Sequence, residues 1–413
     1  MSNNNENKLL PKLRFPGFSN IWRVKPVSEI SEVFRGSPFS KADIDENGSE
    51  QCIHYGELFT KYSEVISSIV SKTNRTDGFR SEEGDVLMPS SDVTPDGLAK
   101  ASAIMLNGVI LGGDMNILRP KKNINPIFLS YLLNHSKRDI IRLVSGTTVK
   151  HIYPSQIIIC PLPIVNDNSE QQKIADCLST LDDVITTESQ KLYILIDYKK
   201  GLLQNLFPQE GGVSPNFRFS EFEEKGDWEE TTLTELADYE NGKAHEQDIE
   251  NSGDYIVVNS KFISSDSEVK KFTNTAFCPA HKGDILMVLS DVPNGKAIAK
   301  CFLVEEDNRF TVNQRICRIT PRNVNSKILY YLLNRKPYFL AFDDGVKQTN
   351  LRKEDVLNCP LLIPSDPKEQ EKIADTLSSI DDLINAQNQK VEALKLHKKG
   401  LLQGLFPSIN NEE

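Results

Sequence analysis

Glu170 to Pro208 reads EQQKIADCLSTLDDVITTESQKLYILIDYKKGLLQNLFP, and Glu369 to Pro407 repeats it as EQEKIADTLSSIDDLINAQNQKVEALKLHKKGLLQGLFP. The copies lie 199 residues apart and are identical at 23 of 39 positions, so they record an internal duplication. Their apolar residues step by four, three and four, the spacing of a seam along one side of a helix. Such a 3.5-residue period is typical of helices that wrap around each other. We therefore predict that each copy forms one long helix whose partner is the other copy.

The predicted seam has the same period in both copies. Both stripes carry a polar residue at the same step, Glu188 and Gln387, which can set the register of paired helices. Pro208 and Pro407 end the helices because proline brings no N–H group. The alternative is that the two helices pack separately on two cores, but matched heptads in duplicated halves favour pairing. The seam residues are Ile174, Leu178, Leu181, Ile185, Leu192, Leu195, Leu202 and Leu206 in the first copy, and Ile373, Leu377, Ile380, Ile384, Val391, Leu394, Leu401 and Leu405 in the second.

The composition is that of an ordinary globular protein. A chain of 413 residues with 38% hydrophobic and 26% charged residues is long enough for two or three domains. It contains no apolar run near the ~18 residues of a membrane span, and MSNNNENK at the N-terminus lacks the apolar core of a signal peptide. Seven cysteines without a Cys-x-x-Cys pair suggest neither a disulfide framework nor a zinc site. We expect a cytoplasmic protein without a metal.

The negative charge of the chain is concentrated in one segment. The net charge is -10, and residues 209–251 alone carry 13 acidic and 3 basic residues. Residues 1–150 and 252–349 are mildly basic, at +2 and +4. This distribution is compatible with contact to DNA, although it is weaker than the basic signature that would indicate it unaided.

The globular stretches also repeat. LRFPGF and Trp22 correspond to FRFSEF and Trp228, EGDVLMPSSDV corresponds to KGDILMVLSDV, and FLSYLLN corresponds to ILYYLLN. Short strand-like runs between helix-like runs predict a mixed α and β fold. Residues 39–80 and 240–281 do not resemble each other. If each copy recognises a target, the two copies recognise different targets. Duplication followed by drift is the simpler alternative.

Signatures of catalysis are missing from the sequence. It has no G-x-x-x-x-G-K-[ST], G-x-G-x-x-G, H-E-x-x-H or G-x-S-x-G motif. The base-gripping motif of an adenine methyltransferase is also missing, since Asn125-Pro126-Ile127-Phe128 lacks the second proline. The six histidines are scattered, and the pairs Asp182-Asp183 and Asp381-Asp382 lie off the seam, which favours a solvated face or docking surface. We expect no catalysis by this chain.

Taken together, these segments resemble the specificity subunit of type I restriction-modification systems. The resemblance rests on LRFPGF with a following Trp, GSPF, IHYGEL, PLP, EQQKIADCLSTLDD and KKGLLQNLFP, then on EQEKIADTLSSIDDLI and KKGLLQGLFP in the second round. It covers nearly the whole chain, and the paired helical repeats are its most specific part. The second half departs from the usual opening, with FRFSEF in place of the Pro-Gly form.

The resemblance implies an α+β fold with pseudo-two-fold symmetry. Two similar mixed α/β target-recognition domains are joined by two long antiparallel helices that form a coiled coil. The expected segments are a disordered tail at 1–11, the first domain at 12–165, the central helix at 166–208, the second domain at 209–364, the C-terminal helix at 365–407 and a tail at 408–413.

The resemblance also implies partners and cofactors. Each domain would read one half of a bipartite, asymmetric target in double-stranded DNA, and the helices would set the gap. Two modification subunits would dock on this frame and bring S-adenosylmethionine for adenine methylation, while two restriction subunits would bring ATP and Mg for translocation and cleavage. No cofactor is expected in this chain. A coiled-coil scaffold bridging protein partners, or a self-sufficient methyltransferase, are the alternatives.

Candidate DNA contacts follow from residue type. Arg, Lys, Asn and Gln read base edges, whereas Lys, Arg, Ser and Thr on loops hold phosphates. An ordinary solvated side chain is the alternative for each residue taken singly. The candidates are Arg35, Ser37, Lys41, Tyr55, Arg75, Arg80, Ser90, Ser91, Lys100, Thr147, Thr148 and Lys150 in the first domain, and Lys243, Asn259, Lys261, Lys270, Lys271, Lys296, Lys300, Gln314, Arg315, Lys347, Gln348 and Asn350 in the second.

Overall fold

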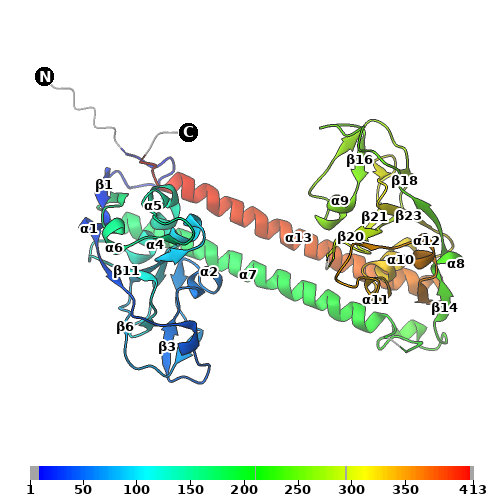
Figure 1. Cartoon of the computed structure of the whole chain (residues 1–413), viewed down its shortest axis with the longest axis horizontal. Coiled ribbons are helices and arrows are strands. Elements are labelled where there is room, and N and C mark those ends of the chain that lie inside the picture. Colours follow the sequence, from blue (N-terminus) through cyan, green and yellow to red (C-terminus); the bar gives the residue numbers. More distant parts are fainter. Residues whose placement is uncertain (1–8, 210, 294, 410–413) are drawn as a thin grey trace. The chain divides into compact units, whose positions relative to one another are not determined.

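The computed structural model describes residues 9–209, 211–293 and 295–409. The chain divides into two compact units (Figure 1). Unit 1 consists of Met1–Gln190 and Asn388–Glu413, and unit 2 of Lys191–Gln387. Each unit therefore combines one globular domain with one end of each long helix.

The described part of unit 1 is an α+β domain with two main sheets. A five-stranded sheet has the order β2-β11-β7-β9-β4, and a four-stranded sheet has the order β5-β3-β10-β6. Two further pairs are β1-β13 and β12-β8. The strands are β1 (Trp22–Pro26), β2 (Ser31–Arg35), β3 (Glu50–Ile53), β4 (Val65–Ile66), β5 (Ser71–Thr73), β6 (Phe79–Arg80), β7 (Asp85–Pro89), β8 (Ser91–Asp92), β9 (Ser102–Ile104), β10 (Ile110–Leu111), β11 (Met115–Pro120), β12 (Lys150–His151) and β13 (Pro161–Val165). The short helices are α1 (Val27–Ile30), α2 (Glu57–Thr60), α3 (Pro95–Leu98), α4 (Pro126–His135), α5 (Lys137–Ile141) and α6 (Pro154–Ile157).

Unit 2 has the same plan. Its sheets run β15-β23-β19-β21 and β17-β16-β22-β18, with the pairs β14-β25 and β20-β24, so the order matches unit 1 apart from a counterpart of β4. The strands are β14 (Glu229–Thr232), β15 (Ala237–Asn241), β16 (Tyr255–Val258), β17 (Phe272–Thr273), β18 (Pro279–Ala280), β19 (Ile285–Val288), β20 (Ser290–Asp291), β21 (Cys301–Leu303), β22 (Phe310–Val312), β23 (Ile316–Pro321), β24 (Thr349–Asn350) and β25 (Pro360–Ile363). The short helices are α8 (Leu233–Leu236), α9 (Ser260–Ser264), α10 (Ser326–Leu333), α11 (Pro337–Leu340) and α12 (Lys353–Leu357).

In each unit, three of the four strands of one sheet lie in sequence that does not repeat. Residues 39–80 include β3, β5 and β6, and residues 240–281 include β16, β17 and β18. In this sheet β3 pairs in parallel with β10, and β16 pairs in parallel with β22. Because parallel strands end at the same edge, the loops that follow them lie side by side.

The two long helices are α7 (Asn168–Leu206) and α13 (Pro367–Leu405), each of 39 residues. At 1.5 Å per residue each is roughly 58 Å long. In unit 1, Lys390 Nζ lies 2.5 Å from Glu188 Oε1 and Lys398 Nζ lies 2.7 Å from Asp182 Oδ1. Residue numbers rise along one helix as they fall along the other, so the helices pair antiparallel. The prediction of two long, paired helices is confirmed.

The seam side chains are covered along both helices. Seven of the sixteen predicted seam residues are buried and nine are half-buried. The seam residues nearest each domain belong to that domain's core: Ile174 and Leu178 of α7 pack with Leu405 of α13 in unit 1. In unit 2, Leu206 of α7 packs with Ile373 and Leu377 of α13 in the core. Each core thus contains both helices, which excludes separate packing.

The repeated N-terminal motif of each domain is explained by one ion pair. Arg14 of LRFPGF donates to both carboxylate oxygens of Glu170, at 2.8 and 2.7 Å. Arg218 of FRFSEF donates to both oxygens of Glu369, at 2.7 and 2.7 Å. Both glutamates open a long helix and are buried. Bidentate Arg–carboxylate pairs are strong and directional, so the arginine, which both motifs share, holds each motif to the start of a long helix.

A lysine in each helix joins the seam to a domain. Lys398 Nζ contacts Asp182 and, at 2.9 Å, Glu64 Oε1, while the hydroxyl of Tyr131 donates to Asp182 Oδ2 at 2.5 Å. Burial opposes the ammonium form, but the two carboxylates outweigh it and raise the pKa of Lys398. We call this set the unit 1 clasp. The solvated face expected for the aspartate pairs is therefore wrong for Asp182.

Unit 2 has the matching clasp. Lys199 Nζ lies 2.5 Å from Asp381 Oδ1, and the hydroxyl of Tyr331 donates to Asp381 Oδ2 at 2.6 Å. The lysine also lies over the tyrosine ring, 5.4 Å from its centroid. The solvated face expected for Asp381 is likewise wrong, because its carboxylate faces the seam.

Parts of the expected tails lie outside the described residues, namely 1–8 and 410–413. Leu9 forms an isolated β-bridge with Trp22 and packs against the core of unit 1. Leu9, which belongs to the segment that we expected to be a disordered tail at 1–11, is therefore part of the packed domain.

Candidate nucleic-acid interface

The loops at the shared edge of the parallel strands form the candidate site. In unit 2, Asn259 to Lys261 follow β16 and Asn313 to Arg315 follow β22. We call Asn313–Arg315 the unit 2 edge loop. Its Arg315 carbonyl accepts from Leu289 N at 3.0 Å, and the Leu289 carbonyl accepts from Leu351 N at 2.8 Å. Three loops are thereby tied side by side in one continuous edge.

A pocket of about 200 Å³ opens at this edge, and we call it the edge pocket. Gln314 Nε2 donates to Glu246 Oε1 at 3.0 Å, and Asn259 Oδ1 accepts from Phe262 N at 2.9 Å. Four of the predicted DNA contacts meet here. The pocket is lined by Glu246, Asn259, Ser260, Lys261, Asn313, Gln314 and Arg315.

The edge pocket contains polar groups that have no side-chain partner among the described residues. Lys261 and Arg315 are exposed, and no described carboxylate lies within 4.0 Å of either charge. The hydroxyl of Ser260 is buried, and no described group forms a hydrogen bond with it. The two exposed cationic side chains suit the pocket to a ligand that carries acceptor atoms.

The same backbone positions in unit 1 carry different side chains. Ser90 N donates to the Asp114 carbonyl at 2.8 Å, and Ile152 N donates to the Ser90 carbonyl at 3.0 Å. Gly112–Asp114 is therefore the unit 1 edge loop, and Asp114 takes the place of Arg315. Its carboxylate lies 3.3 Å from Arg35. The other loop contributes Tyr55, whose ring lies 4.6 Å from that of His54.

One glycine in each unit allows the backbone to approach the edge loop closely. A Cβ on Gly36 would collide with the carbonyl oxygen of Gly112, and a Cβ on Gly242 would collide with that of Asn313. Glycine is therefore required at both positions, which explains the GSPF motif at residues 36–39.

A second group of predicted contacts lies on the short strand pairs next to the edge loops. In unit 1, β8 pairs with β12, placing Lys150 opposite Asp92, next to Ser91. Thr147 and Thr148 lie exposed in the loop before β12. In unit 2, Gln348 Nε2 donates to Ser290 Oγ at 2.6 Å. Asn350 lies opposite Ser290 in the β20–β24 pair, with Lys347 exposed beside it.

Several predicted contacts are already engaged within the fold. Arg75 pairs with Asp77 at 2.7 Å, Arg80 pairs with Glu50 at 2.8 Å, and Lys300 pairs with Asp266 at 2.7 Å. Lys100 donates to the Tyr62 carbonyl at 2.8 Å, and burial lowers its pKa. Ser37 Oγ accepts from Phe79 N at 2.6 Å. These side chains stabilise the domains, and their role in DNA contact stays a prediction.

Other predicted lysines are exposed and do not gather in the pocket. Lys243 lies beside it, because its backbone bridges to Asn313. Lys41, Lys270, Lys271 and Lys296 are exposed elsewhere on the two domains. The sequence reasoning missed Glu246, Ser260 and Asn313, whose only signal was their nearness to predicted residues in the chain.

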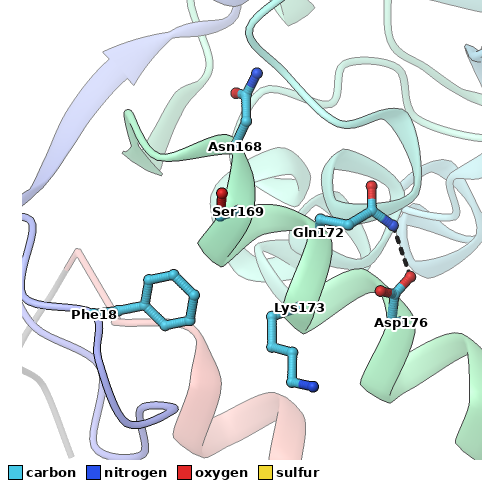
Figure 2. Close-up of a pocket in the computed structure, with 6 residues that line it drawn as sticks. All are labelled: Phe18, Asn168, Ser169, Gln172, Lys173 and Asp176. Atoms are coloured by element: carbon cyan, nitrogen blue, oxygen red, sulfur yellow. Dashed lines mark hydrogen bonds between the residues drawn. The ribbon is translucent and has the colours of Figure 1, made fainter.

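A larger pocket, of about 370 Å³, lies at the start of α7 and contains none of the predicted contacts. Figure 2 shows Gln172 of α7 donating to Asp176, with Nε2 and Oδ1 2.7 Å apart. Lys173 lies over the ring of Phe15, 5.9 Å from its centroid. The pocket is lined by Phe18, Asn168, Ser169, Gln172, Lys173 and Asp176.

The cysteines and acidic groups do not assemble into a metal centre in the part of the chain that the structure describes. No three or more His, Cys, Asp or Glu side chains there are placed to hold an ion. All seven cysteines are free, and burial raises the pKa of the Cys160 thiol to about 12. Among the described helices, none combines the length and apolar character that crossing a bilayer requires.

Comparisons with known proteins agree with this architecture. Residues 20–195 and 225–395 each match the type I restriction modification DNA specificity domain. The type I restriction enzyme MjaVIII specificity subunit of Methanocaldococcus jannaschii is 25% identical over 409 residues, covering 93% of this chain and 92% of that protein. The putative type I restriction enzyme MjaX specificity subunit of the same organism is 24% identical over 415 residues, with the same coverage.

Solved structures show the same fold. The S subunit of a type I restriction-modification system from M. genitalium matches with a TM-score of 0.68 at 16% identity, covering 97% of this chain and 100% of that one. A chain from a structural study of complex assembly and conformational transition in the type I R-M system matches with a TM-score of 0.53 at 16% identity, covering 96% of this chain and 100% of that one.

The chain contains two copies of one α+β domain. Each copy is built together with one end of each of the two antiparallel helices, and each presents a different polar edge. This arrangement defines a duplicated recognition protein. The chain belongs to the family of type I restriction-modification DNA specificity subunits. A protein scaffold without DNA contact is not favoured by this membership.

Proposed function

We propose that the two domains each read one half of a bipartite, asymmetric sequence in double-stranded DNA. The observation that carries this proposal is the pair of edge loops, which occupy equivalent backbone positions but present Gly-Gly-Asp in unit 1 and Asn-Gln-Arg in unit 2. Arg, Asn and Gln donate to base edges in the major groove, whereas Asp accepts from them. Two readers with different chemistry select two different half-sites.

The paired helices would set the gap between the half-sites. Each added base pair moves a half-site by about 3.4 Å and rotates it by roughly a tenth of a turn, so a stiff frame converts length into specificity. The clasps support this role, because Tyr131 and Tyr331 each tie a domain to an aspartate of a long helix. The Arg–Glu pairs at Arg14 and Arg218 hold each domain to the start of a helix.

Catalysis would come from partner subunits. Two modification subunits would dock on the helices, bind S-adenosylmethionine and methylate adenine, and two restriction subunits would use ATP and Mg to translocate and cleave DNA. This chain would bind no cofactor and catalyse no step. Its family membership supports assembly into such a complex, as does its likeness to a chain studied for assembly of the type I R-M system.

The experiment is to produce the chain with its modification subunit and map methylated adenines across the host genome. We expect one motif with two unlike halves separated by a fixed gap. Exchanging residues 12–150 for those of another such subunit should change one half and leave the other half and the gap unchanged. A single undivided motif, or a change in both halves, would contradict the proposal.

A further inference from the structure

We propose that Arg315 reads a guanine in the half-site of unit 2 and is the main determinant of that base. The inference rests on the proposed function, and it assigns to one side chain a role that the family match leaves open. It follows from the position of the residue, from the absence of a partner for it among the described side chains, and from the groups around it.

The position of Arg315 is fixed by the backbone rather than by its own side chain. Its carbonyl accepts from Leu289 N, and Ile316 N donates to the Asn313 carbonyl at 2.9 Å, so the loop between β22 and β23 is a closed turn. Gly242 packs against the Asn313 carbonyl from the other side. The guanidinium therefore extends from a rigid support, as a base-reading side chain requires.

The guanidinium of Arg315 is available, unlike those of nearby arginines. Arg318, on the following strand, pairs with Glu240 at 2.5 Å. Arg322 pairs with Asp238 at 3.3 Å. Arg315 is exposed and forms no ion pair or hydrogen bond with any described side chain. An exposed arginine on a rigid loop is free to bind a partner.

The neighbours of Arg315 suit a base edge better than a phosphate. Gln314 and Asn259 bring amides to the pocket, and Glu246 brings a carboxylate. A carboxylate disfavours a phosphate but tolerates a base. Guanine presents two acceptors, O6 and N7, to the major groove, and the arginine fork donates to both.

The test compares Arg315→Ala, Arg315→Lys and the control Lys282→Ala in the complex with the modification subunit. Lys282 is also exposed, does not line the pocket and is not among the candidate DNA contacts. The probes are duplexes that carry the methylation motif of the wild-type complex, with each base of the unit 2 half-site changed in turn. Exchange of residues 12–150 shows which half belongs to unit 2.

We expect Arg315→Ala to lose about 5- to 150-fold discrimination for guanine at one position of the unit 2 half-site, leaving the other half unchanged. Arg315→Lys should recover part of the affinity but little discrimination, because an ammonium lacks the fork. Lys282→Ala should leave the motif unchanged. An unchanged motif for Arg315→Ala, relaxation in the unit 1 half, or equal weakening of all sequences would overturn the proposal. Failure of the wild-type complex to show a bipartite motif would instead overturn the proposed function.

Discussion

The two units differ most at their edge loops and least where they meet the long helices. Arg14–Glu170 and Arg218–Glu369 are the same bidentate pair, and the tyrosine–aspartate–lysine clasps match atom for atom. At the edge loops, by contrast, Asp114 of unit 1 occupies the backbone position that Arg315 occupies in unit 2. The two domains therefore share the contacts that hold each of them to the long helices. They differ in the loops that follow the parallel strands.

The contacts between each domain and the long helices also differ in two details. The unit 1 clasp includes Glu64 as a second carboxylate on Lys398, whereas Lys199 contacts one described carboxylate, that of Asp381. Phe406 is buried in the core of unit 1, whereas its repeat partner Phe207 is half-buried beside Trp228. Unit 1 thus depends more strongly on the end of α13 than unit 2 depends on the end of α7.

The largest expected effect tests that dependence. Phe406→Ala should destabilise unit 1 by about 3–5 kcal/mol, because it removes a ring that packs on Trp22 and Phe128 and leaves a cavity. Phe207→Ala should destabilise unit 2 by less. Each unit contains one of the two tryptophans, so urea unfolding followed by fluorescence in Trp228→Phe and Trp22→Phe backgrounds reports the units separately. Equal losses would show that both helix ends contribute alike.

The next effect tests the equivalence of the two Arg–Glu pairs. Arg14→Ala should cost unit 1 about 3 kcal/mol, because it leaves the buried carboxylate of Glu170 unpaired. Arg218→Ala should cost unit 2 a similar amount, measured by the same unit-specific unfolding. The matched control is Arg23→Ala, an exposed arginine on β1, which should cost little. A loss in one unit alone would break the symmetry inferred here.

Removing the lysine of each clasp should destabilise the two units to different extents, and the loss of stability should depend on pH. Lys398→Met leaves two carboxylates, Asp182 and Glu64, without their cation, whereas Lys199→Met leaves one. We expect Lys398→Met to be the more destabilising at pH 7, by about 1.5–3 kcal/mol.

The sign of the pH effect follows from the carboxylates. Burial already raises the pKa of Asp182, and loss of the ammonium raises it further. A carboxyl group whose pKa is raised by folding costs stability above that pKa, and the cost disappears below it. The difference between wild type and Lys398→Met should therefore shrink as pH falls from 7 toward the raised pKa of Asp182, which lies above 3.8. Urea unfolding across that range measures it; a difference that grows on acidification would contradict the assignment.

Much of the fold could be predicted because its signals are local or repeated. Heptads within a single segment indicate a paired helix, and a second copy 199 residues later indicates its partner. Asp182 was misplaced for a related reason: spacing alone put it off the seam, but its carboxylate reaches Lys398 and Tyr131 there. The role of a side chain beside the seam depends on which groups its polar atoms can contact. A periodic sequence pattern does not give that information.

The site was less accessible to sequence reasoning. The edge pocket joins loops after β16 and β22, which are distant in the chain and meet because the strands pair in parallel. Arg75 is a candidate by residue type, and Asp77, two residues later, pairs with it within the domain. Residue type selects candidates, whereas strand pairing decides which of them share a surface.

The smallest expected effect on stability concerns the unit 1 edge loop. Asp114→Ala removes an exposed ion pair with Arg35, and such pairs contribute about 0–1 kcal/mol, so unit 1 should unfold almost as before. If unit 1 reads DNA through its edge, the same variant should still change the methylation motif in one half, because an acceptor for base amino groups has been lost. Unit-specific unfolding reports the loss of the ion pair, and the methylation motif reports the loss of the carboxylate, so the two measurements separate the two roles. A motif unaltered by Asp114→Ala would mean that unit 1 reads DNA with other residues, and that equivalent backbone positions do not imply equivalent use.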